Sequence, residues 1–232
     1  MGYSKLICNA PDINKFYVDG DFSYNSKVNI SAHINMIKNV QKTYSNFIKV
    51  WGKEFALEEN IITCIICTES GGENVGRNKF GAIGLMQVTA PTIYECVTKW
   101  NVKVDVPLST TTKAVLSKYI PSWKNWDKNR KMTSVDTDNI ETALKKEEFN
   151  IALGCLCFRW MIDAFAVNGE SNINKPIVAY NKGYYSAKSV MQGLTTTKEL
   201  FNKKGLGKEP KAYLLKMLGV NGFLDLWFKN IK

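Results

Sequence analysis

One carboxylate in this sequence has a setting that favours acid chemistry. Glu69 follows the apolar run Ile62–Cys67 and precedes two glycines, and a Gly-Leu-Met-Gln-Val segment, Gly84–Val88, comes shortly afterwards. Burial disfavours the charged form of a carboxyl group, so apolar surroundings keep it protonated near neutral pH and able to donate a proton to a leaving oxygen. The alternative is that Glu69 simply ends a helix on the solvent side.

Other reactive side chains offer less. The single histidine, His33, makes a zinc enzyme or a serine–histidine triad hard to build. Cys64 and Cys67 form a C-x-x-C pattern, but they lie in an apolar helical run without the strand–helix–strand context of a redox motif. The remaining cysteines are Cys8, Cys96, Cys155 and Cys157. We interpret the cysteines as small buried hydrophobic residues, and we expect no metal and no cofactor.

The chain is strongly basic. Lys and Arg number 31 and Asp and Glu number 21, so the net charge of +10 indicates an anionic partner, or serves solubility alone. The positive charge is scattered and no zinc-finger, helix-turn-helix or RNP pattern is visible, so we expect no nucleic acid. No apolar run approaches the roughly 18–20 residues of a membrane span. The N-terminus lacks the pattern of a signal peptide, which predicts synthesis in a cytosol.

Hydrophobic periodicity predicts helices as the elements that must position Glu69 and the segments around it. The predicted helical ranges are His33–Phe55, Leu57–Glu69, Ala90–Trp100, Leu144–Phe165, Lys175–Tyr185 and Glu199 to the end. Thr89 is a good cap for the third of these, and Pro91 lies at a tolerated early position. Strand signals are few, so the fold should be mainly α. Residues 101–140 are polar and irregular, which predicts a functional insertion or a partly helical segment.

Five short motifs occur in a fixed order along the chain. They are Glu69-Ser70, Gly84-Leu85-Met86-Gln87, Asn150-x-x-Leu153-Gly154, Ala179-Tyr180-Asn181-x-Gly183 and Glu209-x-x-x-Tyr213. Each motif alone is weak, but the order and spacing together are specific. Over about residues 57–218 the sequence resembles the lysozyme-like lytic transglycosylase family, the group of soluble lytic transglycosylases and goose-type lysozymes.

The resemblance implies roles for individual residues. Glu69 would be the catalytic acid, facing a cleft for the glycan strands of bacterial peptidoglycan. The substrate-binding residues that it implies are Ser70, Met86, Gln87, Tyr180, Asn181 and Tyr213. The Tyr180 hydroxyl is expected near the acid, and Met86 on the floor of the cleft. The peptide carboxylates of peptidoglycan would also suit a basic protein.

The same resemblance bears on the reaction. Goose-type lysozymes that hydrolyse have aspartates at places that here hold Asn78 and Thr89, and neither of these can be a base. We therefore expect a lytic transglycosylase, in which Glu69 protonates the glycosidic oxygen and then deprotonates the sugar's C6 hydroxyl, forming 1,6-anhydromuramic ends. The alternatives are a hydrolytic muramidase of the same fold, using Glu73 or an acid within residues 105–148, and a non-catalytic wall-binding virion protein.

The expected organisation is a single mainly α, lysozyme-like catalytic domain over residues 33–232. It has an N-terminal extension at residues 1–32 and an insertion at about residues 101–143. We expect a monomer. Without a signal peptide, a wall enzyme is typical of a bacteriophage, as an endolysin released through a holin or as a part of the virion.

Overall fold

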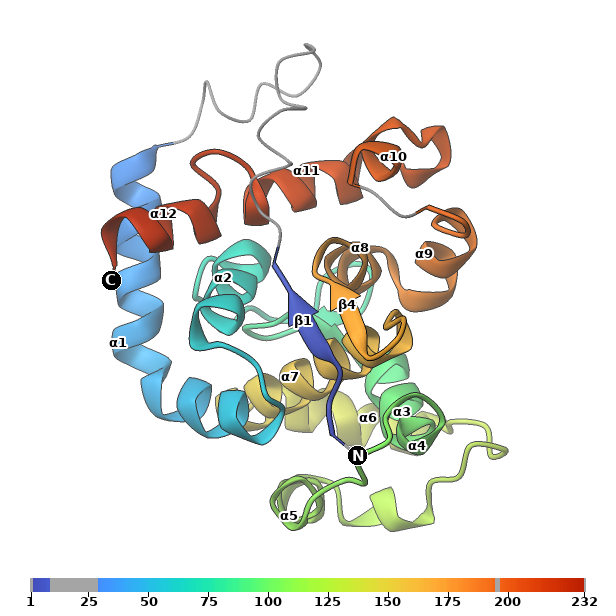
Figure 1. Ribbon diagram of the computed structural model, residues 1–232. Coiled ribbons are helices and arrows are strands. Elements are labelled where there is room, and N and C mark those ends of the chain that lie inside the picture. Colours follow the sequence, from blue (N-terminus) through green and yellow to red (C-terminus); the bar gives the residue numbers. More distant parts are fainter. Residues whose placement is uncertain (1, 9–28, 195–196, 232) are drawn as a thin grey trace.

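The computed structural model describes residues 2–8, 29–194 and 197–231. Helices make up most of this part of the chain (Figure 1). In order, the elements are β1 (Lys5–Ile7), α1 (Ile30–Glu54), α2 (Glu59–Ser70), β2 (Ala82–Ile83), β3 (Val88–Thr89), α3 (Ala90–Thr98), α4 (Trp100–Lys103), α5 (Thr110–Tyr119), the 3-10 helix η2 (Pro121–Asn125), α6 (Ser134–Leu144), α7 (Glu147–Ala164), β4 (Glu170–Asn172), α8 (Asn174–Lys182), α9 (Tyr184–Val190), α10 (Thr197–Asn202), the 3-10 helix η3 (Lys204–Leu206), α11 (Lys208–Leu218) and α12 (Phe223–Asn230).

Helix α7 forms the centre of the core because its sequence is apolar on every side. Every residue from Phe149 to Ile162 is buried, and α1, α3, α5, α6 and α8 all pack against the helix. A helix that is hydrophobic all round is stable only where other elements enclose it. The predicted long apolar helix at Leu144–Phe165 is thus confirmed with slightly shorter bounds.

Three further helices bring the end of α2 against the C-terminal part of the chain. Helix α1 runs along one side of the molecule and α12 crosses it, while α11 lies across the top with α2 beneath (Figure 1). Helix α2 contacts α1, α11 and α12. The C-terminal end of α2 therefore faces side chains that come from about 140 residues later in the sequence, as in the bond from Tyr213 to Glu69 across 144 positions.

The strands form two small sheets. β2 and β3 pair antiparallel, with Ala82 opposite Thr89, and so make a hairpin whose turn is the Gly-Leu-Met-Gln segment. β1 pairs parallel with β4, with Lys5 opposite Glu170. The hairpin is short, and it positions one loop beside α2 rather than building a layer of its own.

The described N-terminal residues are attached to the end of α7. The backbone amide of Ser4 donates to Asp163 Oδ1 at 2.8 Å, and Arg159 Nη2 donates to the Ser4 carbonyl at 2.8 Å. Arg159 and Asp163 are themselves a buried ion pair with an Nε–Oδ2 distance of 2.6 Å. Of the predicted extension, residue 1 and residues 9–28 lie outside the described residues, and α1 begins at Ile30, three positions before the predicted start.

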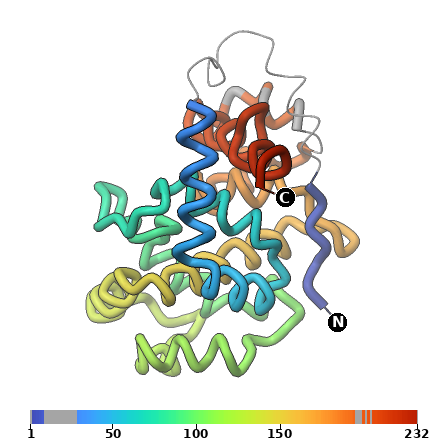
Figure 2. Tube along the Cα trace, turned by 90° about the vertical axis from the view of Figure 1, so that its left-hand side faces the viewer, coloured from blue at the N-terminus to red at the C-terminus, as the bar shows by residue number. Residues whose placement is uncertain are grey.

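The segment predicted as an insertion is largely helical. It contains α4, α5, η2 and most of α6, and it packs on α3 and α7. Ser109 caps α5, and Thr133 with Asp136 forms a capping box at the start of α6. Figure 2 shows the segment, coloured green to yellow, at the opposite end of the molecule from the C-terminal helices.

The predicted single helix at Lys175–Tyr185 is wrong in one respect. Gly183 has a φ of +84°, which ends α8 at Lys182, and α9 starts at Tyr184. Glycine adopts this left-handed conformation at no steric cost, so the chain turns there into a new helix.

Among the described helices, none is both long enough and apolar enough to cross a membrane.

Candidate active site

Glu69 lies in the last turn of α2, at the end of a run of nine buried residues, Asn60–Thr68. Burial raises the pKa of its carboxyl group from 4.5 to about 7, although a hydrogen bond from Tyr213 and the positive charge of Lys216 act in the opposite direction. The carboxyl group is therefore close to half protonated at neutral pH. It can give up a proton and take one back under the same conditions, which is what a group acting as acid and then as base needs.

Two tyrosines flank this acid, and their hydroxyl groups have different partners. Tyr213, on α11, donates a hydrogen bond to Glu69 Oε1 at 2.7 Å. Tyr180, on α8, donates instead to the backbone carbonyl of Met86 at 2.8 Å. Burial is the main cause of the raised pKa of Tyr180, and the negative charge of Glu69 raises it further. The hydroxyl that holds the acid is thus that of Tyr213, whereas Tyr180 ties α8 to the hairpin turn.

One buried side chain, Asn150 of α7, makes three hydrogen bonds at and beside the hairpin turn. Its Oδ1 accepts from the Met86 amide at 2.8 Å, and its Nδ2 donates to the carbonyls of Ile83 at 2.8 Å and Leu144 at 2.9 Å. A Cβ atom on Gly84, whose φ is +80°, would lie 2.1 Å from Asn150 Nδ2. The Asn-x-x-Leu-Gly and Gly-Leu-Met-Gln motifs therefore fit together as one unit.

The side chain of Met86 lies in the core rather than on the cleft floor. It is 0 % exposed, and a Cβ atom on Gly154 would lie 2.4 Å from its sulfur. Gln87, the next residue, does line the cleft. Its φ is +45°, its Nε2 donates to the Gly84 carbonyl at 2.8 Å, and its Oε1 accepts from Asn78 Nδ2 at 3.1 Å. The turn thus directs Met86 inward and Gln87 outward.

Ser70 closes α2 and does not line the cleft. Its hydroxyl donates to the Ile66 carbonyl at 3.1 Å and accepts from the Gly72 amide at 3.2 Å. The Gly72 carbonyl in turn accepts from the Tyr44 hydroxyl of α1 at 3.2 Å. The glycine-containing loop after Glu69 is therefore held between α2 and α1, and Ser70 positions that loop.

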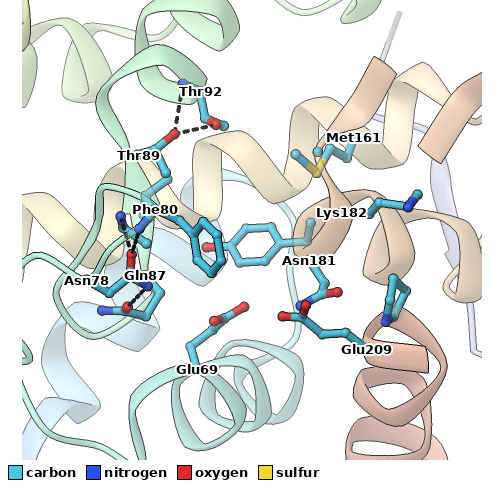
Figure 3. Close-up of a pocket in the computed structure, with 15 residues that line it drawn as sticks. Glu69, Asn78, Phe80, Gln87, Thr89, Thr92, Met161, Asn181, Lys182 and Glu209 are labelled. Carbon is cyan, nitrogen blue, oxygen red and sulfur yellow. Dashed lines mark hydrogen bonds between the residues drawn. The ribbon is translucent and has the colours of Figure 1, made fainter. Parts of the chain in front are cut away.

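A cleft of about 460 Å³ opens above Glu69. It is lined by Glu69, Asn78, Phe80, Ala82, Gln87, Val88, Thr89, Thr92, Met161, Tyr180, Asn181, Lys182, Gly183, Glu209 and Pro210. Figure 3 shows Asn78 and Gln87 on one side, Asn181 and Glu209 on the other, and Glu69 between them. The amide, hydroxyl and aromatic groups around Glu69 can hydrogen-bond to and pack against a hydroxyl-rich polymer such as a glycan.

A second carboxylate, Glu209, lines the cleft, and the sequence reasoning had not assigned it a role in the chemistry. Its negative charge adds to the raised pKa of Glu69. Glu209 and Tyr213 are four positions apart on α11, so they lie on the same helix face. That spacing was visible in the motif Glu209-x-x-x-Tyr213 and could have indicated a carboxylate beside the acid.

The other residues considered as a second acid or base lie elsewhere. Glu73 is exposed and lines a separate hollow between the loop after Glu69 and α1. No residue in 105–148 lines the cleft.

Asn78 and Thr89, at the places where the hydrolysing goose-type lysozymes have aspartates, do line the cleft. Asn78 Oδ1 accepts from the amides of Phe80 and Ala82, which stabilises the loop before β2.

None of the six cysteines, all of them in the described part of the chain, lines this cleft. Five of the six are buried, and burial raises the pKa of the thiols of Cys64, Cys67, Cys96 and Cys155. Within the described ranges, no group of three or more His, Cys, Asp and Glu side chains could hold a metal ion. Thiols that remain protonated are poor nucleophiles, so these cysteines contribute packing.

Part of the sequence that forms this site matches the model of a known protein family. Residues 46–115 match the family model of the transglycosylase SLT domain. The match includes Glu69 and the Gly-Leu-Met-Gln turn, and it ends before Asn150, Tyr180 and Tyr213. No curated protein matches this chain. Together with the helical architecture, the SLT match confirms the predicted fold class, a mainly α, lysozyme-like fold.

Proposed function

We propose that this protein cleaves the β-1,4 bond between N-acetylmuramic acid and N-acetylglucosamine in peptidoglycan as a lytic transglycosylase. The SLT match supports peptidoglycan transglycosylase activity in general. The observation that carries the assignment of Glu69 is its position at the cleft with a pKa of about 7. An acid with this pKa serves both halves of a reaction that first gives a proton and then removes one.

The proposed reaction has two steps. Glu69 transfers its proton to the glycosidic oxygen as the bond from that oxygen to C1 of the muramic sugar breaks, and the neighbouring acetamido oxygen bonds to C1. The Glu69 carboxylate then takes the proton of the C6 hydroxyl, O6 bonds to C1, and the acetamido oxygen leaves. The product carries a 1,6-anhydro ring, Glu69 regains its proton, and no water is consumed.

The surrounding residues would divide the work. Tyr213 holds the acid through its hydroxyl, and Gln87 and Asn181, which lie on opposite sides of the cleft (Figure 3), would bind the substrate between them. Tyr180 holds the turn that carries Gln87. Lys182 lines the cleft and adds positive charge where peptide carboxylates pass.

A hydrolytic muramidase is the second candidate, and the observation that favours it is Glu209. Among the described residues, Glu69 and Glu209 are the carboxylates that line the cleft. Glycosidases that admit water generally use a second carboxylate as base or nucleophile. In that reaction Glu209 would activate water, and the products would carry hydrated reducing ends.

The masses of the products separate the two candidates. We expect mass spectrometry of muropeptides released from purified peptidoglycan to show 1,6-anhydromuramic ends, whose mass is one water lower than that of hydrolysed reducing ends. Glu209→Gln should keep those anhydro ends and lose much less rate than the roughly 10²–10⁴-fold expected for loss of a general base. Glu73→Gln, outside the cleft, is the matched control. Hydrated ends in the parent, together with a collapse of rate in the Glu209 variant, would assign the protein as a muramidase.

The two tyrosines give a further prediction. Tyr213→Phe removes a hydrogen bond that lowers the pKa of Glu69, so the alkaline limb of the pH–activity profile should move to higher pH. Tyr180→Phe removes a bond to the Met86 carbonyl instead, so it should lower turnover without moving that limb. Lysis of cell walls measured from pH 5 to 9 checks both, and the reverse pattern would exchange the two roles.

The biological setting stays a prediction. Action as a monomer, from a bacteriophage particle or after release through a holin, is consistent with a wall-degrading reaction. The third reading, a wall-binding virion protein without turnover, predicts that purified walls keep their turbidity in the presence of the protein.

A further inference from the structure

Lys216 is a partly buried cation that binds the residue before the acid. It lies on α11, three positions after Tyr213, so both side chains leave the helix on the same face. Its Nζ donates to the backbone carbonyl of Thr68 at 2.7 Å, and Thr68 is joined to Glu69 by a peptide bond. Helix α11 therefore contacts the end of α2 twice, once at the carboxyl group and once at the carbonyl before it.

Burying a lysine is costly unless other groups favour its charge. Burial lowers the pKa of Lys216, and the charge of Glu69 acts most strongly in the other direction. None of the ion pairs found within 4.0 Å in the described part of the chain includes Lys216. The Nζ also lies 5.7 Å from the ring centroid of Phe223, a cation–π contact. The Lys216 ammonium group is thus held by the Thr68 carbonyl and the Phe223 ring. Its charge acts on Glu69 without an ion-pair contact.

We propose that Lys216 is a positioning residue for Glu69, which holds the end of α2 in place and stabilises the carboxylate that remains after the proton has been given away. This inference rests on the proposed function for its role in turnover, because only a reaction with a second step needs that carboxylate. Lys216 does not line the cleft, so it acts on the acid without touching substrate.

The groups around the acid act in opposite directions. Burial and the charge of Glu209 favour the neutral form of Glu69, whereas Tyr213 and Lys216 favour the carboxylate. Burial raises the pKa of Tyr180 on α8, and the negative charge of Glu69 adds to this rise. Burial raises the pKa of Cys67 to about 12 although the charge of Lys216 acts in the opposite direction, so Cys67 stays a thiol.

The single histidine adds no competing charge. His33 of α1 stacks on Phe223 with ring centroids 4.6 Å apart. Burial is the main cause that lowers the pKa of His33, and the positive charge of Lys216 lowers it further. Its Nδ1 atom is buried without a hydrogen-bond partner. His33 is therefore neutral at pH 7, and Lys216 is the cation that acts on Glu69.

The test follows the Glu69 carboxyl group directly. In the full-length protein with ¹³C-labelled glutamate, Lys216→Met should raise the titration midpoint of Glu69 by roughly one pH unit, the lower end of the effect of a close opposite charge. The alkaline limb of the pH–activity profile for wall lysis should move to higher pH by the same amount. Lys216→Arg keeps the charge and should restore most of the parent midpoint. Lys208→Met makes the same charge change on α11 and should leave it unmoved, because Lys208 is not among the groups that act on Glu69.

A reciprocal measurement keeps the proposal testable if Lys216→Met does not fold. In Glu69→Gln, the Lys216 amine, followed through its ¹³Cε signal, should titrate at lower pH than in the parent, since coupling between two sites is mutual. An unchanged Glu69 midpoint in folded Lys216→Met, or an unchanged Lys216 midpoint in Glu69→Gln, overturns the inference. Hydrated products or intact walls would instead count against the proposed function, because neither titration depends on turnover.

Discussion

Glu69→Gln is expected to stop lysis of purified cell walls almost completely. The amide has nearly the shape of the carboxyl group and can still accept the hydrogen bond from Tyr213, but it has no proton to give to the glycosidic oxygen. Loss of general acid catalysis alone costs roughly 10²–10⁴-fold, and loss of the base in the second step adds to this. Loss of turbidity and release of muropeptides measure the effect, and near-parental rates in the folded variant would show that Glu69 is not the acid.

The same variant carries its own folding control. The pKa of Glu69 is raised from 4.5 to about 7 in the folded protein, so ionisation disfavours the fold. This penalty is absent below about pH 4.5 and is complete only above pH 7, where it amounts to at most about 3 kcal/mol, since each pH unit of difference corresponds to 1.36 kcal/mol. Glu69→Gln should match the parent in free energy of unfolding at pH 4.5 and exceed it at pH 8. An inactive variant that is less stable at pH 8 would indicate a misfolded site.

Asn150→Ala is expected to lower the free energy of unfolding by about 3–5 kcal/mol, since each unsatisfied buried group costs about 1–3 kcal/mol. The substitution removes the partners of the Met86 amide and of the Ile83 and Leu144 carbonyls. It also leaves a cavity, because Asn150 is 0 % exposed. Urea denaturation measures the loss.

Asn139→Ala is the matched control for that substitution. Asn139 is exposed on α6, and alanine there should leave the free energy of unfolding within about 0.5 kcal/mol of the parent or raise it slightly. Asn150→Asp separates hydrogen bonding from volume, because aspartate has the same shape but loses the two donated bonds and places a carboxylate in the core. A loss near zero for Asn150→Ala would mean that other contacts hold the hairpin turn.

The local part of this site was predictable from sequence, because burial along one helix is a property of its own residues. The apolar run before Glu69 predicted a carboxyl group with a raised pKa, and the structure gives it a pKa of about 7. The cap at Thr89 and the helix after it are likewise local and are confirmed. The capping box of Thr133 and Asp136 was also readable, and it would have located α6 inside the segment predicted as a functional insertion or partly helical.

The contacts between distant helices were not predictable in this way. Nothing in the periodicity of α11 indicates that Tyr213 rather than Tyr180 holds the acid, because that depends on how α8 and α11 pack around α2. The same holds for Glu209, which reaches the cleft from the far end of the sequence. Gly183 is a different case, since a glycine inside a predicted helix already indicates where it can end.

The attachment of Ser4 to the end of α7 also dictates an order of events during biosynthesis. Ser4 and Asp163 are 159 positions apart, so at a translation rate of about 5–20 residues per second the first strand waits roughly eight to thirty seconds for its docking site to be made. Once Arg159 and Asp163 have been made, their buried pair lacks two of its hydrogen bonds until Ser4 docks. Closing so long a loop adds little to the final entropy cost but delays the contact, so docking of the N-terminal strand should be among the last steps of folding.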